Sequence, residues 1–421
     1  MKLRMILSVA AVIACMAMHA ADPTATNYTL DECQGSFMPY PVPGRPYDAP
    51  DSLTAVFVNH VGRHGARFPS SAKSVLTILD ALERADSIGC ITPKGRQLLA
   101  MTRYLARVAA GQWGALDSLG MAEQRGIASR MYMNFPQLFN DRRVDALSSY
   151  APRCVMSMYS FTHQLDRLNN KVELYTSAGR QNSPLMRFFD LDKEYLAFRA
   201  DKTAQPTYDA YFDATVPVSG LKRVLGDGYP YGTEEQARKL AYTEYKVVAG
   251  MNASGIACDM GDFFTREEAN RLWTVENLGH YLERTATTLS TIPADIASGL
   301  LTELVATLER AVAGESPATV MLRFGHAETL MPLLSLLRLR GCYYMTNYFD
   351  TVGQHWQDFN VVPMAANLQM ILYKSQRGNY YLRVDLNEVP VPLMPNSESV
   401  YTPWSVARDY MLRCIPLYYL N

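Results

Sequence analysis

Two short apolar segments, each followed by a polar loop and then a helical pattern, constrain the fold of this chain more than any other feature. The first covers residues 54–59 and the second covers residues 319–324. Short runs of β-branched and apolar residues predict strands that are buried on both faces, as in sheets covered by helices. The strand–loop–helix order therefore predicts an α/β fold with a central sheet flanked by helices.

The rest of the chain suggests two parts. Its 421 residues are 48% hydrophobic and 19% charged, which is enough apolar material for one or two domains. Strand signals are sparse between residues 116 and 314, where helical patterns dominate. We therefore expect an α/β core made of residues 21–115 plus 315–421, and a mostly helical inserted domain at residues 116–314.

Two local signals specify individual elements. Residues 369–373 and 380–386 alternate around an Arg-Gly-Asn turn, which predicts a β-hairpin. Thr265 is followed three residues later by Glu268, the pattern of a capping box at the start of a helix.

The N-terminus has the pattern of an export signal. Two basic residues precede an apolar stretch at residues 5–14, and small residues follow up to Ala20. This stretch is about half of the roughly 20 residues that span a bilayer, so residues 1–20 are expected to be a cleaved signal. Cleavage after Ala20 would release a soluble protein. Residues 12–15 also resemble a bacterial lipobox, which would make Cys15 a lipidated N-terminus. We expect an exported protein that is periplasmic, secreted or an outer-membrane lipoprotein.

The cysteines leave the disulfides undetermined. The chain has seven, and removing Cys15 leaves six in an exported protein, where disulfides are permitted. Six cysteines allow 15 pairings, among which the sequence does not choose. No Cys-x-x-Cys pair occurs and no histidine lies near a cysteine pair, so a zinc site is not expected.

The charge balance excludes one class of partner. Lys plus Arg number 40 against 41 Asp plus Glu, a net charge of −1. General nucleic-acid binding requires a clustered excess of positive charge, so nucleic acid is not expected as a partner. Any polyanionic ligand must be held by a local basic site. No carboxylate cluster suited to Mg²⁺ or Ca²⁺ appears, so neither a metal nor a cofactor is expected.

The most informative motif is Arg-His-Gly-Ala-Arg-Phe-Pro at residues 63–69, directly after the first predicted strand. Arg63 and Arg67 flank His64. Backbone N–H groups at a helix start attract anions, and a guanidinium can bind a phosphate through two hydrogen bonds. A neutral histidine there can attack phosphorus while the arginines offset the charge on the transferring oxygens. The setting favours a phosphoryl-transfer site over a solvated Arg-His-Arg run.

This motif resembles the signature of the histidine acid phosphatases, the family that includes the phytases. The resemblance implies a histidine-phosphatase-like central sheet, with catalysis in the α/β core. It also implies that His64 becomes a phosphohistidine and that Arg63 and Arg67 bind the phosphate. Proteins similar to phosphoglycerate mutase share Arg-His-Gly but lack the Arg-x-Pro that follows here.

Two distant segments extend the resemblance. Arg153, at the start of a predicted helix, resembles the third phosphate-binding arginine of the family. Gly-His-Ala-Glu-Thr at residues 325–329 follows the second predicted strand. By resemblance His326 donates to the phosphate and Glu328 protonates the leaving oxygen. Most acid phosphatases and phytases carry an Asp directly after this histidine, whereas His-Ala-Glu resembles the multiple inositol polyphosphate phosphatases. A carboxyl group that keeps its proton beside a bound anion has a raised pKa, which implies a low working pH.

Other cations and histidines are weaker candidates. Lys73, expected one turn into the following helix, is a candidate ligand for a second phosphate. Arg180 and Arg187 are weaker still. The histidines outside the motifs are expected to be structural, although His60 lies close to the predicted site: His60, His163, His280 and His355.

These features favour a phosphomonoesterase that dephosphorylates inositol hexakisphosphate and lower inositol polyphosphates through a phosphohistidine. Two alternatives remain. One is a broad-specificity histidine acid phosphatase that acts on simple monoesters. The other is a non-catalytic inositol-phosphate binder, which the presence of both His64 and Glu328 disfavours. A membrane is expected as a partner only through lipidation at Cys15.

Overall fold

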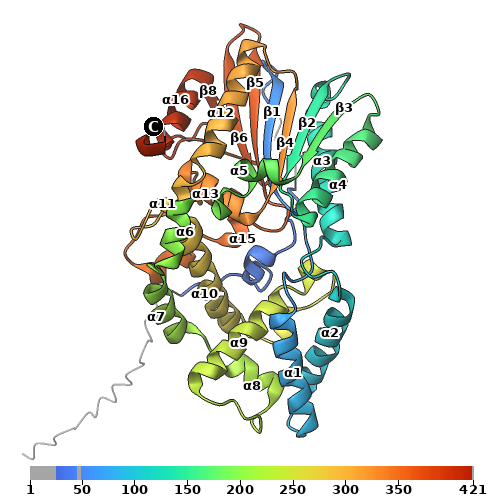
Figure 1. Cartoon of the computed structure of the whole chain (residues 1–421), viewed down its shortest axis with the longest axis vertical. Coiled ribbons are helices and arrows are strands. Elements are labelled where there is room, and N and C mark those ends of the chain that lie inside the picture. Colours follow the sequence, from blue (N-terminus) through green and yellow to red (C-terminus); the bar gives the residue numbers. More distant parts are fainter. Residues whose placement is uncertain (1–24, 45–48, 420–421) are drawn as a thin grey trace, which may run out of the picture.

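The structure is a computed structural model that describes residues 25–44 and 49–419 (Figure 1). The expected export signal at residues 1–20, including Cys15, lies outside the described residues. No helix in the described ranges is long and apolar enough to cross a membrane.

A central sheet of eight strands forms the upper half of the molecule in Figure 1. Its order is β3-β2-β4-β1-β5-β6-β7, with β8 paired to β6. The four strands from β3 to β1 run parallel, and β5 joins β1 antiparallel. The strands are β1 (Leu53–Arg63), β2 (Arg143–Ser148), β3 (Glu173–Ala178), β4 (Val320–Gly325), β5 (Asn367–Ser375), β6 (Tyr380–Leu386), β7 (Val389–Val391) and β8 (Tyr401–Pro403). The predicted α/β class, the two buried strands and the hairpin are confirmed.

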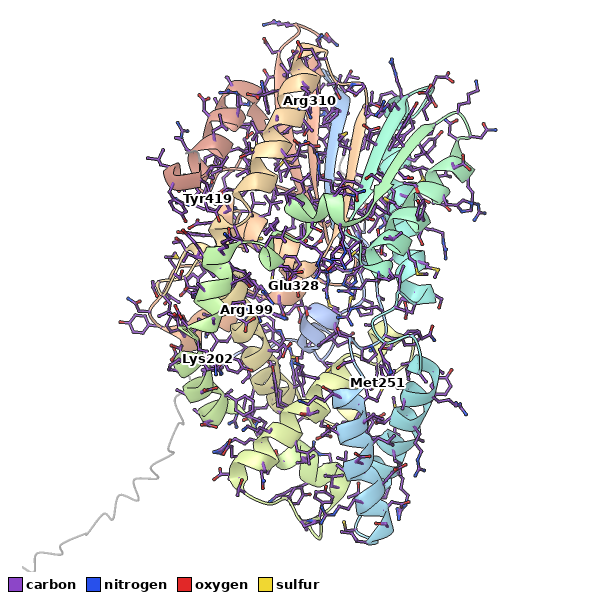
Figure 2. The ribbon with its side chains drawn as sticks, viewed as in Figure 1. Arg199, Lys202, Met251, Arg310, Glu328 and Tyr419 are labelled. Carbon is purple, nitrogen blue, oxygen red and sulfur yellow. The ribbon has the colours of Figure 1, made fainter. Side chains whose placement is uncertain are left out.

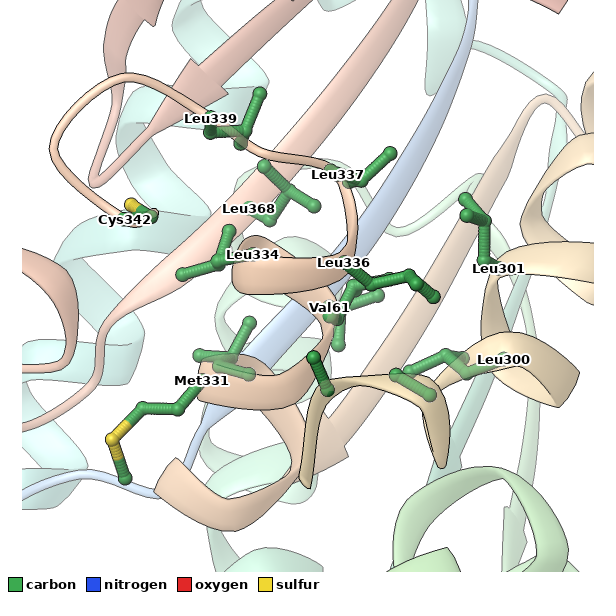
Figure 3. Packing of buried hydrophobic residues seen from close by; sticks show 14 of the residues in the cluster. Val61, Leu300, Leu301, Met331, Leu334, Leu336, Leu337, Leu339, Cys342 and Leu368 are labelled. Atoms are coloured by element: carbon green, nitrogen blue, oxygen red, sulfur yellow. The ribbon is translucent and has the colours of Figure 1, made fainter. Parts of the chain in front are cut away.

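Helices cover both faces of the sheet. Phe57 and Val61 of β1 pack in one apolar core with α12 (Ser298–Ala313) and α13 (Ala327–Leu336). Figure 3 shows Val61 of this core with residues of both helices. Val58 points to the opposite face and packs in a second core with α3 (Ser118–Asn134) and α4 (Pro152–Leu168). Because successive side chains of a strand alternate between faces, a strand between two helical layers must be apolar on both sides.

A helical lobe fills the lower half of the molecule in Figure 1 and has an apolar core of its own. Thr265 and Glu268 form the predicted capping box at the start of the longest helix of this lobe, α10. The helices of the lobe are α1 (Lys73–Ser87), α2 (Pro93–Ala109), α8 (Ser219–Leu225), α9 (Glu234–Ala249) and α10 (Arg266–Arg284). The remaining helices are α5 (Ser183–Met186), α6 (Lys193–Ala200), α7 (Gln205–Thr215), α11 (Ile292–Asp295), α14 (Val352–His355), α15 (Asp358–Val361) and α16 (Trp404–Cys414).

The expected boundaries between core and insertion differ from this arrangement. β2 and β3 lie within residues 116–314 but pair into the central sheet next to β4. α1 and α2, from residues 21–115, belong to the helical lobe. β2 is buried at alternate positions only, and β3 is the edge strand of the sheet with no fully buried residue. Neither segment carries the continuous apolar run that marks β1 and β4, which is why the sequence pattern missed them.

All six cysteines in the described ranges are unpaired. The pairings that the sequence left open are therefore absent among them: Cys33, Cys90, Cys154, Cys258, Cys342 and Cys414.

Candidate active site

The two predicted motifs meet because their strands are neighbours. β1 and β4 are parallel, and Arg63 at the end of β1 pairs with Gly325 at the end of β4. His64 and His326 therefore leave the sheet side by side at the same edge, with ring centroids 5.8 Å apart. The carboxyl edge of parallel strands is where α/β proteins generally bind ligands.

His64 is oriented and uncharged. Its Nδ1 lies 2.9 Å from the carbonyl oxygen of Gly65. A carbonyl oxygen only accepts hydrogen bonds, so Nδ1 carries the proton and Nε2 keeps its lone pair. Burial, and then the charges of Arg63 and Arg67, hold the pKa of His64 well below its usual value. The imidazole is therefore a neutral nucleophile.

The start of α3 fixes the loop that carries His64. A Cβ atom on Gly65 would lie 2.4 Å from the carbonyl oxygen of Gly120, so no side chain fits at this approach of two backbones. Glu123 accepts hydrogen bonds from the backbone N–H groups of Ala66, at 2.7 Å, and Tyr40, at 2.8 Å. These contacts hold the loop in one conformation.

Three arginines form a cradle around His64. Arg63 Nη1 donates to the carbonyl oxygens of Ser36, at 2.6 Å, and Val362, at 2.5 Å. The Nε atoms of Arg63, Arg67 and Arg153 are buried, and within the described part of the chain they have no hydrogen-bond partner. Burial lowers the pKa of Arg63 to about 10 and that of Arg67 to about 9, so both stay charged near neutral pH. Buried donors without partners are costly, which favours an anion as their ligand.

His326 lies between polar groups from three segments. Arg153 Nη2 is 3.1 Å from its Nδ1, while Ser149 Oγ and Arg187 Nη1 are each 3.0 Å from its Nε2. Burial, and then the charge of Arg153, lowers the pKa of His326 to about 3. A guanidinium only donates, so Arg153 and Arg187 compete for the one lone pair of the neutral ring, and the other ring nitrogen carries an N–H.

Glu328 lies in the first turn of α13, between the sheet and the helical lobe (Figure 2). Burial raises its pKa, but the charge of Arg284 outweighs burial and holds the pKa of Glu328 below its usual value. Arg284 Nη2 is 3.9 Å from Glu328 Oε1. Arg284 therefore stabilises the carboxylate in the ligand-free site, and the raised pKa expected beside a bound anion stays a prediction.

A cavity of about 370 Å³ joins these groups to the helical lobe. Its volume is in the range of small-molecule sites, about 300–1,000 Å³. The sheet side contributes the arginine cradle, His64 and Glu328. The helical side contributes Ser70, Ser71 and Ser74 near α1, together with Lys246, Glu276, His280 and Arg284 from α9 and α10.

Lys73 is placed differently from the prediction. It is exposed and is the first residue of α1, and it is not among the residues that line the cavity. The start of α1 instead turns Ser70, Ser71 and Ser74 toward the cavity. The helix was expected to begin earlier, and a shift of two or three residues rotates a side chain to another face of a helix.

The sequence patterns do not mark four cations at or near the site. Arg187 is only a weak candidate from the sequence, and no motif contains Lys246 or Arg284. His280 was assigned to structure; it contacts the buried Asp358, with Nδ1 2.9 Å from Oδ2, but it also lines the cavity. One signal was available, because Glu276, His280 and Arg284 follow one another at intervals of four residues and so share one face of α10.

The other histidines have varied settings. His60 is buried against the rings of Phe161 and Phe324, with centroids 5.5 and 5.3 Å away, as a structural role requires. His355 stacks on Tyr344 at 4.4 Å. Among the described residues, no group of three or more His, Cys, Asp or Glu side chains is arranged to hold a metal ion.

Comparisons with known proteins identify the family of this chain. The model of the histidine phosphatase superfamily (branch 2) matches residues 165–387, just over half of the chain. Multiple inositol polyphosphate phosphatase 1 of Gallus gallus is 26% identical over 378 residues, covering 84% of this chain and 80% of the relative. The human protein of the same name is 25% identical over 393 residues, covering 85% and 80%.

Solved structures share the fold. The Bifidobacterium longum multiple inositol polyphosphate phosphatase, in complex with inositol hexasulfate, has a TM-score of 0.76 at 17% identity, covering 89% of this chain and 96% of that one. The phytase from D. castellii has a TM-score of 0.69 at 17% identity, covering 94% and 89%. The family match contains His326 and Glu328, and the geometry adds His64 to them. This chain belongs to branch 2 of the histidine phosphatase superfamily.

Proposed function

We propose that the protein is a phosphomonoesterase that removes phosphate groups from inositol hexakisphosphate and lower inositol polyphosphates through a phosphohistidine at His64. One observation carries the proposal. A neutral imidazole with a free Nε2 lies among three arginines whose buried Nε donors have no partner in the described part of the chain. This arrangement suits in-line attack on a bound phosphate.

In the first step the phosphate of the substrate binds to Arg63, Arg67, Arg153 and His326. His64 Nε2 forms a bond to phosphorus while the bond from phosphorus to the inositol oxygen breaks. Glu328 gives its proton to that oxygen, and the alcohol leaves. Proton transfer of this kind contributes about 10²–10⁴-fold to the rate.

In the second step water attacks the phosphohistidine. Glu328, now ionised, takes a proton from the water, the bond between phosphorus and nitrogen breaks, and His64 is restored as inorganic phosphate leaves. Glu328 is ionised in the ligand-free site. A bound phosphate adds negative charge beside Glu328 and raises its pKa. At acid pH, substrate binding therefore causes Glu328 to take up the proton that it gives to the leaving oxygen in the first step.

The substrate class rests on the cations that line the cavity outside the arginine cradle and on the relatives. Lys246, His280 and Arg284 line the cavity outside the arginine cradle, where a simple monoester has no further phosphate to offer them. A net charge of −1 provides no long-range attraction, so these local cations carry the affinity. The curated relatives are named as phosphatases of inositol polyphosphates.

The test compares phosphate release from inositol hexakisphosphate and from a small aryl phosphate by the purified protein at several pH values. The proposal expects higher kcat/KM for inositol hexakisphosphate and stepwise lower inositol phosphates as products. Turnover of the aryl phosphate alone would establish the broad acid phosphatase instead. Absence of release from every monoester at every pH would establish the non-catalytic binder.

We also propose that the protein is exported, supported by the basic, apolar and small-residue order of residues 1–20. The mass of the mature N-terminus from the native host tests this. A chain that begins after Ala20 supports a soluble form, and a lipid mass on Cys15 supports the lipoprotein. A mature chain that retains residues 1–20 would contradict export by a cleaved signal.

A further inference from the structure

The helical side of the cavity contains an ion network that the two-step mechanism does not use. Glu276 of α10 lies between two cations: its Oε2 is 3.5 Å from Lys246 Nζ, and its Oε1 is 3.7 Å from His280 Nε2. The Tyr242 hydroxyl donates to the same carboxylate. The Glu276 side chain is only 11% exposed, yet all three charged groups line the cavity.

This network also separates two cavities. A second cavity of about 320 Å³ lies along α7 and α10 and shares Lys246, Glu276 and His280 with the first. The network therefore has a cavity on each side, where packed side chains would otherwise hold it in place.

His280 is set up as a donor. Its Nδ1 lies 2.9 Å from the buried Asp358, and Trp273 Nε1 donates to the other oxygen of that carboxylate at 2.9 Å. A carboxylate only accepts, so Nδ1 carries a proton. Burial lowers the pKa of His280, but Asp358 and Glu276 outweigh burial and raise it above the usual value. The ring then presents a second N–H at Nε2.

Glu276 thus lies within ion-pair distance of two cations in the cavity that also contains the arginine cradle. A phosphate oxygen can accept charge-assisted hydrogen bonds from the same two cations. We propose that a ring phosphate remote from the scissile one replaces Glu276 as the partner of Lys246 and His280, so that Glu276 weakens substrate binding by competing for these cations. The inference rests on the proposed function and adds a specificity-determining residue to it.

The test is Glu276→Gln, which keeps the shape of the side chain and removes its charge. Like charges close together cost binding energy, so the KM for inositol hexakisphosphate should fall about three- to tenfold. A small aryl phosphate has no second phosphate, so its KM should fall by a much smaller factor. The ratio between the two substrates is therefore the readout, and a merely structural role for Glu276 would not change it.

Glu267→Gln is the matched control, because Glu267 lies on the same helix, is exposed and is not among the residues that line either cavity. It should leave the ratio unchanged. Lys246→Gln is a second test, and it should raise the KM for inositol hexakisphosphate more than that for the aryl phosphate. The inference is overturned if Glu276→Gln raises the KM for inositol hexakisphosphate, or if Glu267→Gln gives the same change.

Two measurements keep the outcomes distinct. Thermal unfolding shows whether Glu276→Gln is folded, and if it is not, Lys246→Gln decides, with an unchanged KM for inositol hexakisphosphate as the contradicting result. Inhibition of aryl phosphate hydrolysis by inositol hexakisphosphate reports the same contact without turnover. A wild-type protein that is inhibited by inositol hexakisphosphate but does not hydrolyse it would refute the proposed function, while the inhibition constants of the variants would still test the inference.

Discussion

The rings of His64 and His326 meet edge to face, with centroids 5.8 Å apart. The two residues follow neighbouring parallel strands whose last residues, Arg63 and Gly325, are paired in register. Backbone hydrogen bonds of the sheet thus set the distance between the proposed nucleophile and its partner. A phosphate that accepts a hydrogen bond from His326 is thereby placed within reach of His64.

His64→Ala should abolish turnover, because it removes the imidazole that forms the bond to phosphorus. We expect a loss in kcat of more than about 10³-fold, as for other nucleophile deletions. Phosphate release measures the loss, and circular dichroism checks the fold. His163→Ala, at an exposed position of α4, is the control and should retain wild-type activity. Wild-type rates in His64→Ala would refute the nucleophile.

Arg187→Ala should impair turnover although no motif contains this residue. Arg187 contacts His326 Nε2 at 3.0 Å, and loss of a charged hydrogen-bond partner should lower kcat/KM about 10- to 100-fold. Arg180 is a close control, because both guanidinium groups lie over the ring of Tyr150, at 4.5 and 4.9 Å from its centroid. A similar loss in Arg180→Ala would attribute the effect to that stacking instead of to His326.

Glu328→Gln should separate binding from proton delivery. The variant keeps the shape of the side chain but has no proton to give, so kcat for inositol hexakisphosphate should fall about 10²–10⁴-fold. An aryl phosphate with a good leaving group should lose much less, since its oxygen leaves without protonation. Equal losses on both substrates would remove Glu328 from the acid role.

The pH profile should depend on Arg284. His64 has a pKa well below its usual value, so the nucleophile stays unprotonated at acid pH. Glu328 must be protonated for the first step, so kcat falls as pH rises through the pKa of Glu328 in the substrate complex. Arg284 lowers that pKa. Removing its charge in Arg284→Gln should therefore move the alkaline limb of kcat to higher pH, by about one unit.

The measurement is kcat against pH for the wild type, Arg284→Gln and a control. Arg199→Gln removes a charge from an exposed position of α6 and should leave the limb in place. Glu328→Gln should lack the limb altogether. A limb that stays at the same pH in Arg284→Gln would mean that another group sets the protonation of Glu328.

Sequence patterns identified strands β1 and β4 of the sheet and the motif residues that directly follow them. β1 and β4 carry continuous apolar runs because they are buried on both faces, and each is followed directly by its motif. Local order along the chain, together with the resemblance to the histidine acid phosphatases, was therefore enough to select Arg63, His64, Arg67, His326 and Glu328 as candidates. It was also enough for the hairpin β5–β6 and for the helix caps, which depend on neighbouring residues.

Only the tertiary structure decided the helical side of the cavity. Lys246, His280 and Arg284 lie on helices, where a solvated side chain and a ligand-binding one have the same local pattern. The contact of Arg187 with His326 is likewise a tertiary one. The tertiary structure also decided that Lys73 lies outside the cavity lining and that Glu328 is ionised before substrate binds. A sequence records which side chains each element carries, but charge interactions and cavities depend on distances between elements, and packing alone sets those distances.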